Sequence, residues 1–168
     1  MWTTWGSTVD ERARPYPCDS FVASPVAALF RAIDVNAQPD EVFRWLCQLR
    51  VAPYSYDLID NLGRRSPRQL TPGLTDLRVG QRVMTIFTLV GFESGEHLTI
   101  RMDHGLFGEI ACSYVVSPAP EGSRLVVKLL VRYRRGPLGV LMRWLLPLGD
   151  LIMMRRQLRT LAALAEQG

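Results

Sequence analysis

The pattern of apolar and polar positions predicts a strand, a short helix, a series of strands and a long final helix. Residues 27–35 are strand-like, and Pro39 then occupies a favourable first position of a helix. Asp40 and Glu41 complement the N-terminal dipole of this helix. Apolar residues then recur at steps of three and four, so one face of the helix should be buried. These residues are Val42, Phe43, Leu46, Cys47 and Leu49.

Four strand candidates follow a short helical turn or loop that begins after Pro53. Residues 81–92 and 96–103 flank a Ser-Gly turn, which is a hairpin signal. Residues 109–117 and 124–134 flank a second turn with the sequence PAPEGS. The four candidates therefore predict an antiparallel meander.

Alternation along two of these strands predicts which side faces the core. In residues 124–134 the odd-numbered positions are apolar and should face inward. In residues 96–103 the even-numbered positions should face inward, which leaves His97 and Thr99 on the outer side. Residues 81–92 are apolar on both sides, so the pattern leaves the inward side of that strand open.

The end of the chain predicts a helix long enough to cross a whole sheet. Apolar residues recur at helical spacing in residues 137–166, which would extend ~45 Å at 1.5 Å per residue. Pro147 should bend or break this helix, giving two helical pieces or one kinked helix. The apolar run 138–154 is interrupted by charges and is shorter than the ~20 residues of a membrane span, so we interpret it as a core helix.

Length and composition indicate a single globular domain. The 168 residues fit one core, preceded by a polar arm rich in proline that we place at residues 1–24, with the domain at 25–168. The net charge is +4 and Lys128 is the only lysine, a bias toward arginine that fits either anionic partners or the codon composition of the genome. Three widely spaced cysteines do not suggest a disulfide scaffold. The N-terminus lacks a secretory pattern, so a cytoplasmic location is expected.

The sequence contains no pattern that is typical of a metal site or a nucleophilic catalytic site. His97 and His104 are the only histidines, and they lack cysteine or acidic partners at ligand spacing. No serine lies in a GxSxG turn. We therefore predict no metal and no cofactor. Asp150, inside the apolar run, needs a partner, and Arg143 or Arg155 is the expected one.

Two other groups of residues suggest binding functions. Tyr54, Tyr56 and Asp57 could offer phenol and carboxylate groups to a ligand, although a packed ring for Tyr56 and a helix-capping carboxylate for Asp57 are the simpler explanation. A series of arginines from Arg132 to Arg159 raises the question of nucleic acid, which the absence of interleaved aromatic residues disfavours. Contact with an anionic bilayer fits the arginines better than nucleic acid does, because apolar residues suited to a membrane surface lie next to one of them. The residues that suggest this transient contact are Arg143, Trp144 and Leu145.

The order of these elements resembles the helix-grip fold of the START-related superfamily. This superfamily (SRPBCC-like) includes the birch-pollen-allergen-like proteins, the polyketide cyclase/dehydrase proteins and lipid-transport proteins. The resemblance covers residues 27–166 and is carried by IDVNAQPDEVFRWL, APYSYDLIDN and GDLIMMRRQLRTLAALAE. It implies an α+β fold in which a curved antiparallel sheet wraps around a long C-terminal helix, with a short helix pair after the first strand.

The resemblance also implies an apolar cavity between the sheet and the final helix. The expected function is binding or transport of a hydrophobic or aromatic small molecule, such as a lipid or a polyketide-like compound. The alternative is an enzyme of the polyketide cyclase/dehydratase type with cavity acid-base groups. A third possibility is a regulatory or assembly partner that uses Ile86, Val90 and Phe92. The oligomeric state stays open. The expected ligand-binding residues are Tyr54, Tyr56, Asp57, Phe87, Leu89, Ile100, Met102, Tyr133, Leu141 and Leu145.

Overall fold

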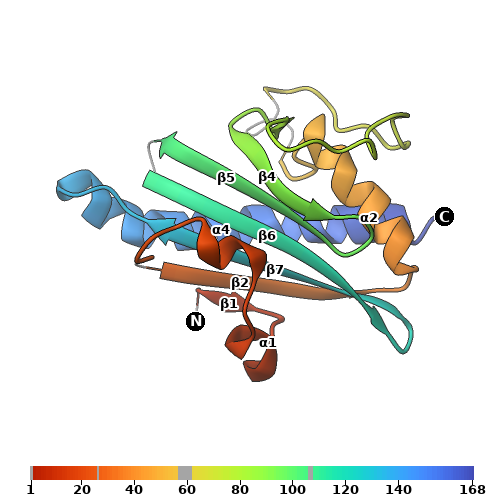
Figure 1. The fold of residues 1–168 in the computed structure, drawn as a ribbon, viewed down its shortest axis with the longest axis horizontal. Coiled ribbons are helices and arrows are strands. Elements are labelled where there is room, and N and C mark those ends of the chain that lie inside the picture. Colours follow the sequence, from red (N-terminus) through yellow and green to blue (C-terminus); the bar gives the residue numbers. More distant parts are fainter. Residues whose placement is uncertain (1, 26, 57–61, 106–107) are drawn as a thin grey trace.

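A computed structural model describes residues 2–25, 27–56, 62–105 and 108–168. Its strands form a seven-stranded sheet in the order β1-β2-β7-β6-β5-β4-β3, and a long helix, α4, crosses one face of it (Figure 1). All neighbouring strands are antiparallel except β1 and β2, which are parallel. The strands are β1 Thr4–Trp5, β2 Ala27–Val35, β3 Arg82–Val83, β4 Phe87–Glu93, β5 His97–Gly105, β6 Gly108–Ala119 and β7 Gly122–Arg132. The helices are α1 Val9–Ala13, η1 Pro17–Ser20, α2 Pro39–Cys47, η2 Gln48–Arg50 and α4 Pro137–Ala165.

This architecture confirms the predicted α+β helix-grip fold. The strand 27–35, the helix that begins at Pro39 and the last three strands of the meander occur where the sequence pattern placed them. The predicted strand 81–92 is instead divided into β3 and β4, which pair antiparallel with each other. In α2, Pro39 occupies the first turn with Asp40 and Glu41, and the apolar side buries Phe43 and Leu46. The short helix α2 follows β2 after the three residues 36–38, and η2 continues directly from α2.

The inward face of the meander follows the predicted alternation. The odd-numbered residues of β7, from Leu125 to Val131, and Tyr133 just after it lie in the main core, as do Leu98, Ile100 and Met102 of β5. The sequence left open which side of β4 faces the core. The pairing of β4 with β5 is irregular between Leu89 and Gly91. An extra residue in one strand reverses the alternation beyond it, which explains why β4 is apolar on both sides.

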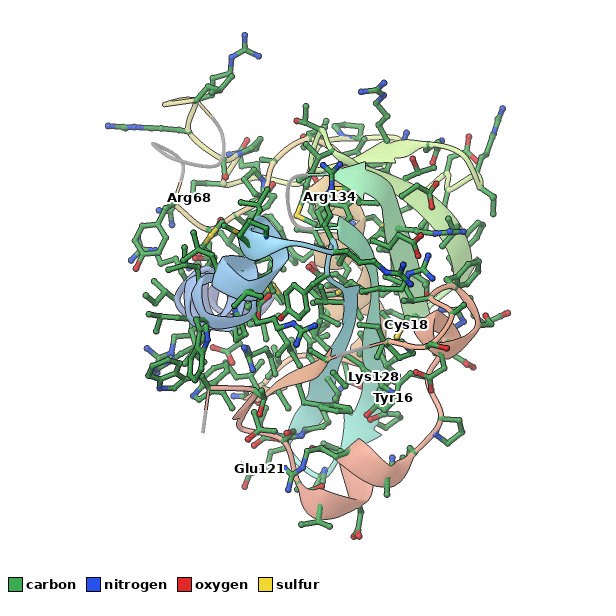
Figure 2. The ribbon with its side chains drawn as sticks, turned by 90° about the vertical axis from the view of Figure 1, so that its left-hand side faces the viewer. Tyr16, Cys18, Arg68, Glu121, Lys128 and Arg134 are labelled. Carbon is green, nitrogen blue, oxygen red and sulfur yellow. The ribbon has the colours of Figure 1, made fainter. Side chains whose placement is uncertain are left out.

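The N-terminal segment packs on the outer face of the sheet and builds a second, smaller core there. Tyr16 and Cys18 bury Val126 and Leu130, two even-numbered residues of β7 (Figure 2). Thr99 was expected to face solvent, but it is completely buried under this cover. Its hydroxyl shares a 2.8 Å hydrogen bond with Ser113 of β6, which satisfies both groups.

The N-terminal segment that covers the outer face also provides the ion-pair partner of Lys128, the only lysine of the chain. The Lys128 ammonium lies 2.6 Å from a carboxylate oxygen of Asp19 and 5.2 Å from the centre of the Tyr16 ring. Residues 3–22 thus add β1 and a second layer to the sheet, while the division into an arm and a domain stays an expectation.

The final helix continues through its proline. α4 runs unbroken from Pro137 to Ala165 with Pro147 inside it, so one helix is present rather than two pieces. Its first turns extend past the ends of β5 and β6, whereas its later turns lie behind the sheet (Figure 1). The two halves of α4 therefore have different surroundings.

Candidate functional site

The interface between the sheet and α4 is completely buried at one end and slightly less buried at the other, which we call the unsealed end. Near the C-terminal half of α4, inward side chains such as Leu98, Leu125 and Leu158 are completely buried. Toward the β5–β6 turn, five inward side chains each keep 7 to 9% of their surface exposed. Three come from the sheet and its end, and two come from the N-terminal half of α4: Met102, Leu129 and Tyr133, and Met142 and Leu146.

The strand register places the three sheet residues together. Met102 lies opposite Ile110, which lies opposite Val131 on β7. Leu129 and Tyr133 are two residues on either side of Val131, so they point the same way. The described part of this unsealed end therefore combines methionine, leucine and tyrosine side chains, a flexible apolar lining with a polar group.

A buried ion pair lies at the β2 side of this interface. The odd-numbered residues of β2 face inward, and this places Arg31 on the same side as Leu29. Its guanidinium Nη2 is 2.7 Å from a carboxylate oxygen of Asp150 on α4, and the two side chains are 1% and 10% exposed. The expected partners of Asp150, Arg143 and Arg155, are therefore wrong. Alternation along β2 was the available signal for Arg31, because it places an arginine in line with apolar inward positions.

Arg31 also connects three segments of the chain. Its Nη1 donates to the Phe30 carbonyl at 2.8 Å, and its Nη2 donates to the Trp2 carbonyl at 3.0 Å. Nη2 also lies 3.4 Å from the Pro147 carbonyl of α4. These contacts fasten α4 and the N-terminus to β2, and they give the arginine a structural role whatever else it does.

Burial controls the electrostatics of this region. Desolvation raises the pKa of Asp150 to about 6, although the neighbouring Arg31 charge acts in the opposite direction. Burial also raises the pKa of Tyr133, and the Asp150 charge adds to that effect while Arg143 opposes it. The Tyr133 hydroxyl makes no hydrogen bond to any described residue. A buried phenol near a carboxyl whose pKa lies close to neutrality can position a polar group or exchange a proton with it.

A second polar group fixes the other half of α4. The Tyr114 hydroxyl donates to Gln157 Oε1 at 2.8 Å, and Gln157 Nε2 donates to the Pro53 carbonyl at 2.7 Å. Burial raises the pKa of Tyr114 well above its ordinary value. This chain of hydrogen bonds is satisfied internally, so it joins β6, α4 and the loop after η2.

Tyr54 and Tyr56, which were expected to offer polar groups to a ligand, lie in different surroundings. Tyr54 is buried, with its ring edge-on to Trp45 at 6.1 Å, and its φ of +54° lies in the left-handed region that non-glycine residues seldom occupy. Tyr56 lies outside, where the Arg156 guanidinium is 5.6 Å from its ring centre. Asp57 lies outside the described residues. The structure thus places only Tyr54 of this group in the main core.

The other expected ligand-binding residues divide into three groups. Met102 and Tyr133 lie at the unsealed end, while Leu89 and Ile100 lie in the sealed core with Phe87 partly buried against it. Leu141 and Leu145 are half exposed on the outer side of α4, so the expectation that they face a ligand inside does not fit their placement. Sequence reasoning missed Arg31, Leu129, Met142 and Leu146.

The remaining candidates for chemistry have ordinary surroundings. His97 is half-buried, and burial lowers its pKa while Glu93 and Glu96 act to raise it. In the described part of the chain, no three His, Cys, Asp or Glu side chains form a group that could hold a metal ion. The three cysteines are free and buried, and burial raises the pKa of each thiol.

The third function considered above depended on an exposed side of β4. Ile86, just before β4, is exposed, but Val90 and Phe92 are only partly exposed and Phe92 packs against the main core. These three residues therefore do not form one exposed apolar surface.

Comparison with known proteins shows likeness at the level of the fold. No protein-family model and no curated protein matches the sequence. Among solved structures, protein CV1439 from Chromobacterium violaceum superposes with a TM-score of 0.54 at 15% identity, covering 83% of this chain and 96% of that one.

Two similar structures come from natural-product biosynthesis. The di-domain ARO/CYC protein StfQ of the steffimycin biosynthetic pathway has a TM-score of 0.51 at 13% identity, covering 83% of this chain and 50% of that one. DynU16 from the dynemicin biosynthetic locus has a TM-score of 0.50 at 20% identity, covering 80% of this chain and 46% of that one. At these identities the likeness shows the fold alone.

Proposed function

We propose that this protein binds a hydrophobic or aromatic small molecule, such as a lipid or a polyketide-like compound, between the sheet and the N-terminal half of α4. The observation that carries the proposal is the contrast between the two ends of this interface. Five inward side chains at one end keep 7 to 9% of their surface exposed, whereas Leu98, Leu125 and Leu158 at the other end are completely buried. A partly open, mainly apolar space with a few polar groups is the usual form of a small-molecule site.

The polar groups at this end favour a ligand that is not purely hydrocarbon. The Tyr133 hydroxyl makes no hydrogen bond to a described residue, and Asp150 lies close enough for its charge to raise the tyrosine pKa. A carbonyl or hydroxyl on the ligand would satisfy the phenol, and satisfying a buried polar group is worth about 1 to 3 kcal/mol. We therefore propose an oxygen-bearing ligand, oriented by Tyr133.

Two neighbouring residues of α4 provide a matched test of the site. Leu146 points inward and Leu145 points outward, so the same change to tryptophan fills the site in one case and not in the other. We expect Leu146→Trp to weaken binding of the neutral dye Nile red at least tenfold in a fluorescence titration, while Leu145→Trp changes it less than twofold. Equal dye affinity in both variants would overturn the proposed location.

A catalytic role is the second candidate, and the effect of the Asp150 charge on the buried Tyr133 phenol favours it. A carboxyl with a pKa of about 6 can both accept and return a proton near neutral pH. The similarity to the ARO/CYC protein StfQ suggests the class of reaction, the cyclisation or dehydration of a polyketide-like substrate.

The enzymatic alternative is tested with a synthetic poly-β-ketone thioester, with products followed by mass spectrometry. An enzyme should convert the compound faster than buffer does, and Tyr133→Phe should lower that rate at least tenfold with unchanged Nile red binding. A rate equal to buffer for the unaltered protein rejects catalysis and leaves the binding proposal standing.

The proposed setting is the cytoplasm. All three cysteines are free and buried, an arrangement that suits a reducing compartment because no disulfide contributes to the fold. The proposed partner in that compartment is the small molecule itself.

A further inference from the structure

An apolar stripe runs along the outside of α4. Five side chains recur at alternating steps of three and four residues, which places them on one side of the helix. Each is 38 to 50% exposed, and the neighbouring Val140 and Trp144 are 58% and 68% exposed. The five residues of this apolar stripe are Leu138, Leu141, Leu145, Leu148 and Ile152.

The apolar stripe continues directly into a cluster of arginines. Ile152 is its last residue and also lines a surface depression of about 470 Å³. Arg155, Arg156 and Arg159, one and two turns further along α4, line the same depression together with Arg68. Figure 2 shows Arg68 on the loop above α4, on the side away from the sheet. We call this the arginine depression.

The charges of the arginine depression are held in place by aromatic rings. The guanidinium groups of Arg155 and Arg159 lie 5.1 and 5.6 Å from the Trp5 ring centre, and Arg156 lies over Tyr56. None of these arginines forms an ion pair with a described carboxylate. Among the described residues, no carboxylate therefore competes with an external anion for these donors.

Positive charge also flanks the other end of the apolar stripe. Arg134 and Arg135 lie just before α4, separated from it by Gly136, and both are exposed. Neither pairs with a carboxylate in the part of the chain that the structure describes. The stripe is thus an apolar surface between two cationic ends.

We propose that the outer face of α4 docks on an anionic phospholipid bilayer, with the apolar stripe in the interfacial layer and a lipid phosphate in the arginine depression. A helix that lies in the membrane plane typically combines an apolar face with flanking arginines. Tryptophan favours the interfacial layer of a bilayer. Docking of the apolar stripe would place the exposed Trp144 in that layer. Guanidinium groups bind phosphate through paired donors.

A second copy of the chain is a poorer occupant of the same surface. In an antiparallel pair of α4 helices centred on Leu145, Leu138 would meet Ile152, but Arg135 would then face Arg155 of the other copy. In a parallel pair each arginine would face its own equivalent. Both arrangements bring like charges together at the ends of the contact, which is destabilising, whereas an anionic surface neutralises them.

Docking on the surface also fits better than crossing the bilayer. By length and composition α4 could span a membrane, a criterion that core helices of other proteins also meet. However, its C-terminal half packs into the main core, and Asp150 in its middle is paired with Arg31 of the sheet. Insertion across a bilayer would have to break both arrangements.

The test is flotation of the full chain with vesicles of phosphatidylcholine alone or of phosphatidylcholine with phosphatidylglycerol. We expect binding to the mixed vesicles that weakens as sodium chloride is raised, because salt screens surface charge. Leu145→Ser should weaken it about tenfold through lost apolar burial. Arg156→Gln with Arg159→Gln should weaken it about thirtyfold.

Matched controls separate the surface from general charge and hydrophobicity. Arg78→Gln with Arg82→Gln removes the same net charge from two exposed arginines near β3, and Ile86→Ser alters an exposed apolar residue there. Both controls should bind the mixed vesicles within about twofold of the unaltered protein. Equal losses in the controls and the α4 variants would overturn the proposal.

Two further measurements identify the other possible occupants. If light scattering shows a dimer that Leu145→Ser converts to a monomer, the stripe is an interface between copies and the proposal is wrong. If inorganic phosphate raises the melting temperature through Arg156 and Arg159 while vesicles are not bound, the depression takes free phosphate and the proposal is also wrong. None of these results depends on the interior ligand, because the substituted side chains all lie on the outer surface.

Discussion

The two halves of α4 both carry several leucines but have opposite surroundings. The C-terminal half buries Leu158, Leu161 and Leu164 against the sheet and α2, whereas the N-terminal half exposes most of its leucines. In Figure 1 the first turns of α4 project beyond the ends of β5 and β6, whereas its later turns run behind the sheet toward α2. The difference shows that apolar content alone does not place a helix in a core, because the sheet must be long enough to cover it.

The two halves of α4 therefore have different roles. The C-terminal half supplies stability through completely buried side chains and the Tyr114–Gln157 hydrogen bond. The N-terminal half offers an incompletely sealed inner side and an apolar outer side, both suited to contact with other molecules. Asp150 lies between the two halves, where its pair with Arg31 fixes the helix to β2.

Truncating one leucine in each half should give the largest difference. Leu158 is 0% exposed, so Leu158→Ala removes buried methyl groups and leaves a cavity. We expect the free energy of unfolding to fall by about 3 to 5 kcal/mol. Leu145→Ala, at a residue that is 50% exposed, should change it by less than about 0.5 kcal/mol.

Denaturant unfolding followed by circular dichroism measures both values, provided that the slopes with denaturant stay equal. Similar losses for the two variants would mean that the outer side of α4 is covered in solution, and the contrast would fail.

Removing the cation between the two halves should have the next largest effect. Arg31→Met leaves the Asp150 carboxyl buried without its partner, and breaking a buried pair in this way typically costs about 3 kcal/mol or more. The loss should be smaller at pH 4, where the carboxyl is protonated. The control is Arg44→Met, which breaks an exposed pair with Glu41 and should cost less than about 0.5 kcal/mol.

The double variant Arg31→Met with Asp150→Leu tests whether the unpaired carboxyl causes this loss of stability. If the stranded carboxyl causes the loss, the double variant should recover most of the stability. A double variant that is no more stable than Arg31→Met would assign the loss to the carbonyl contacts of Arg31 instead.

The pH dependence should give the smallest effect. Because the folded-state pKa of Asp150 is raised to about 6, the unfolded chain releases this proton first as the pH rises from about 4. The contribution of Asp150 to stability is therefore complete below pH 4, falls between about pH 4 and 6 and is constant above that. The total change should be less than about 3 kcal/mol.

The measurement is the free energy of unfolding from pH 4 to pH 7 for the unaltered protein and for Asp150→Asn. Other acidic groups titrate in both proteins, so the difference between the two curves isolates Asp150. A constant difference across this range would show that its pKa is not raised.

Most of the fold could be predicted from the sequence because local signals and burial agree there. Turn residues separate the strands, and the odd-numbered residues of β7 are apolar and buried as expected. The cover formed by Tyr16 and Cys18 could not be predicted in the same way, because it comes from distant residues that pack on the outer face. Thr99 is buried for that reason alone.

The site was less predictable, for two physical reasons. The N-terminal half of α4 is apolar on several sides, so helical spacing identified a helix without showing that Leu141 and Leu145 face outward and Leu146 inward. Asp150 was recognised as a charge in need of a partner, but the nearest arginines in sequence were chosen. The actual partner, Arg31, lies on a strand more than a hundred residues earlier, and alternation along β2 was the signal that could have found it.

The short strands at the two margins of the sheet have a consequence for how the protein meets other molecules. β1 and β3 each contain two residues, and very short edge strands are one of the ways in which proteins discourage pairing with a strand of another chain. Backbone-mediated stacking of copies into extended sheets is thereby discouraged. The protein can carry an exposed apolar helix face at working concentrations without also offering a template for fibrous growth.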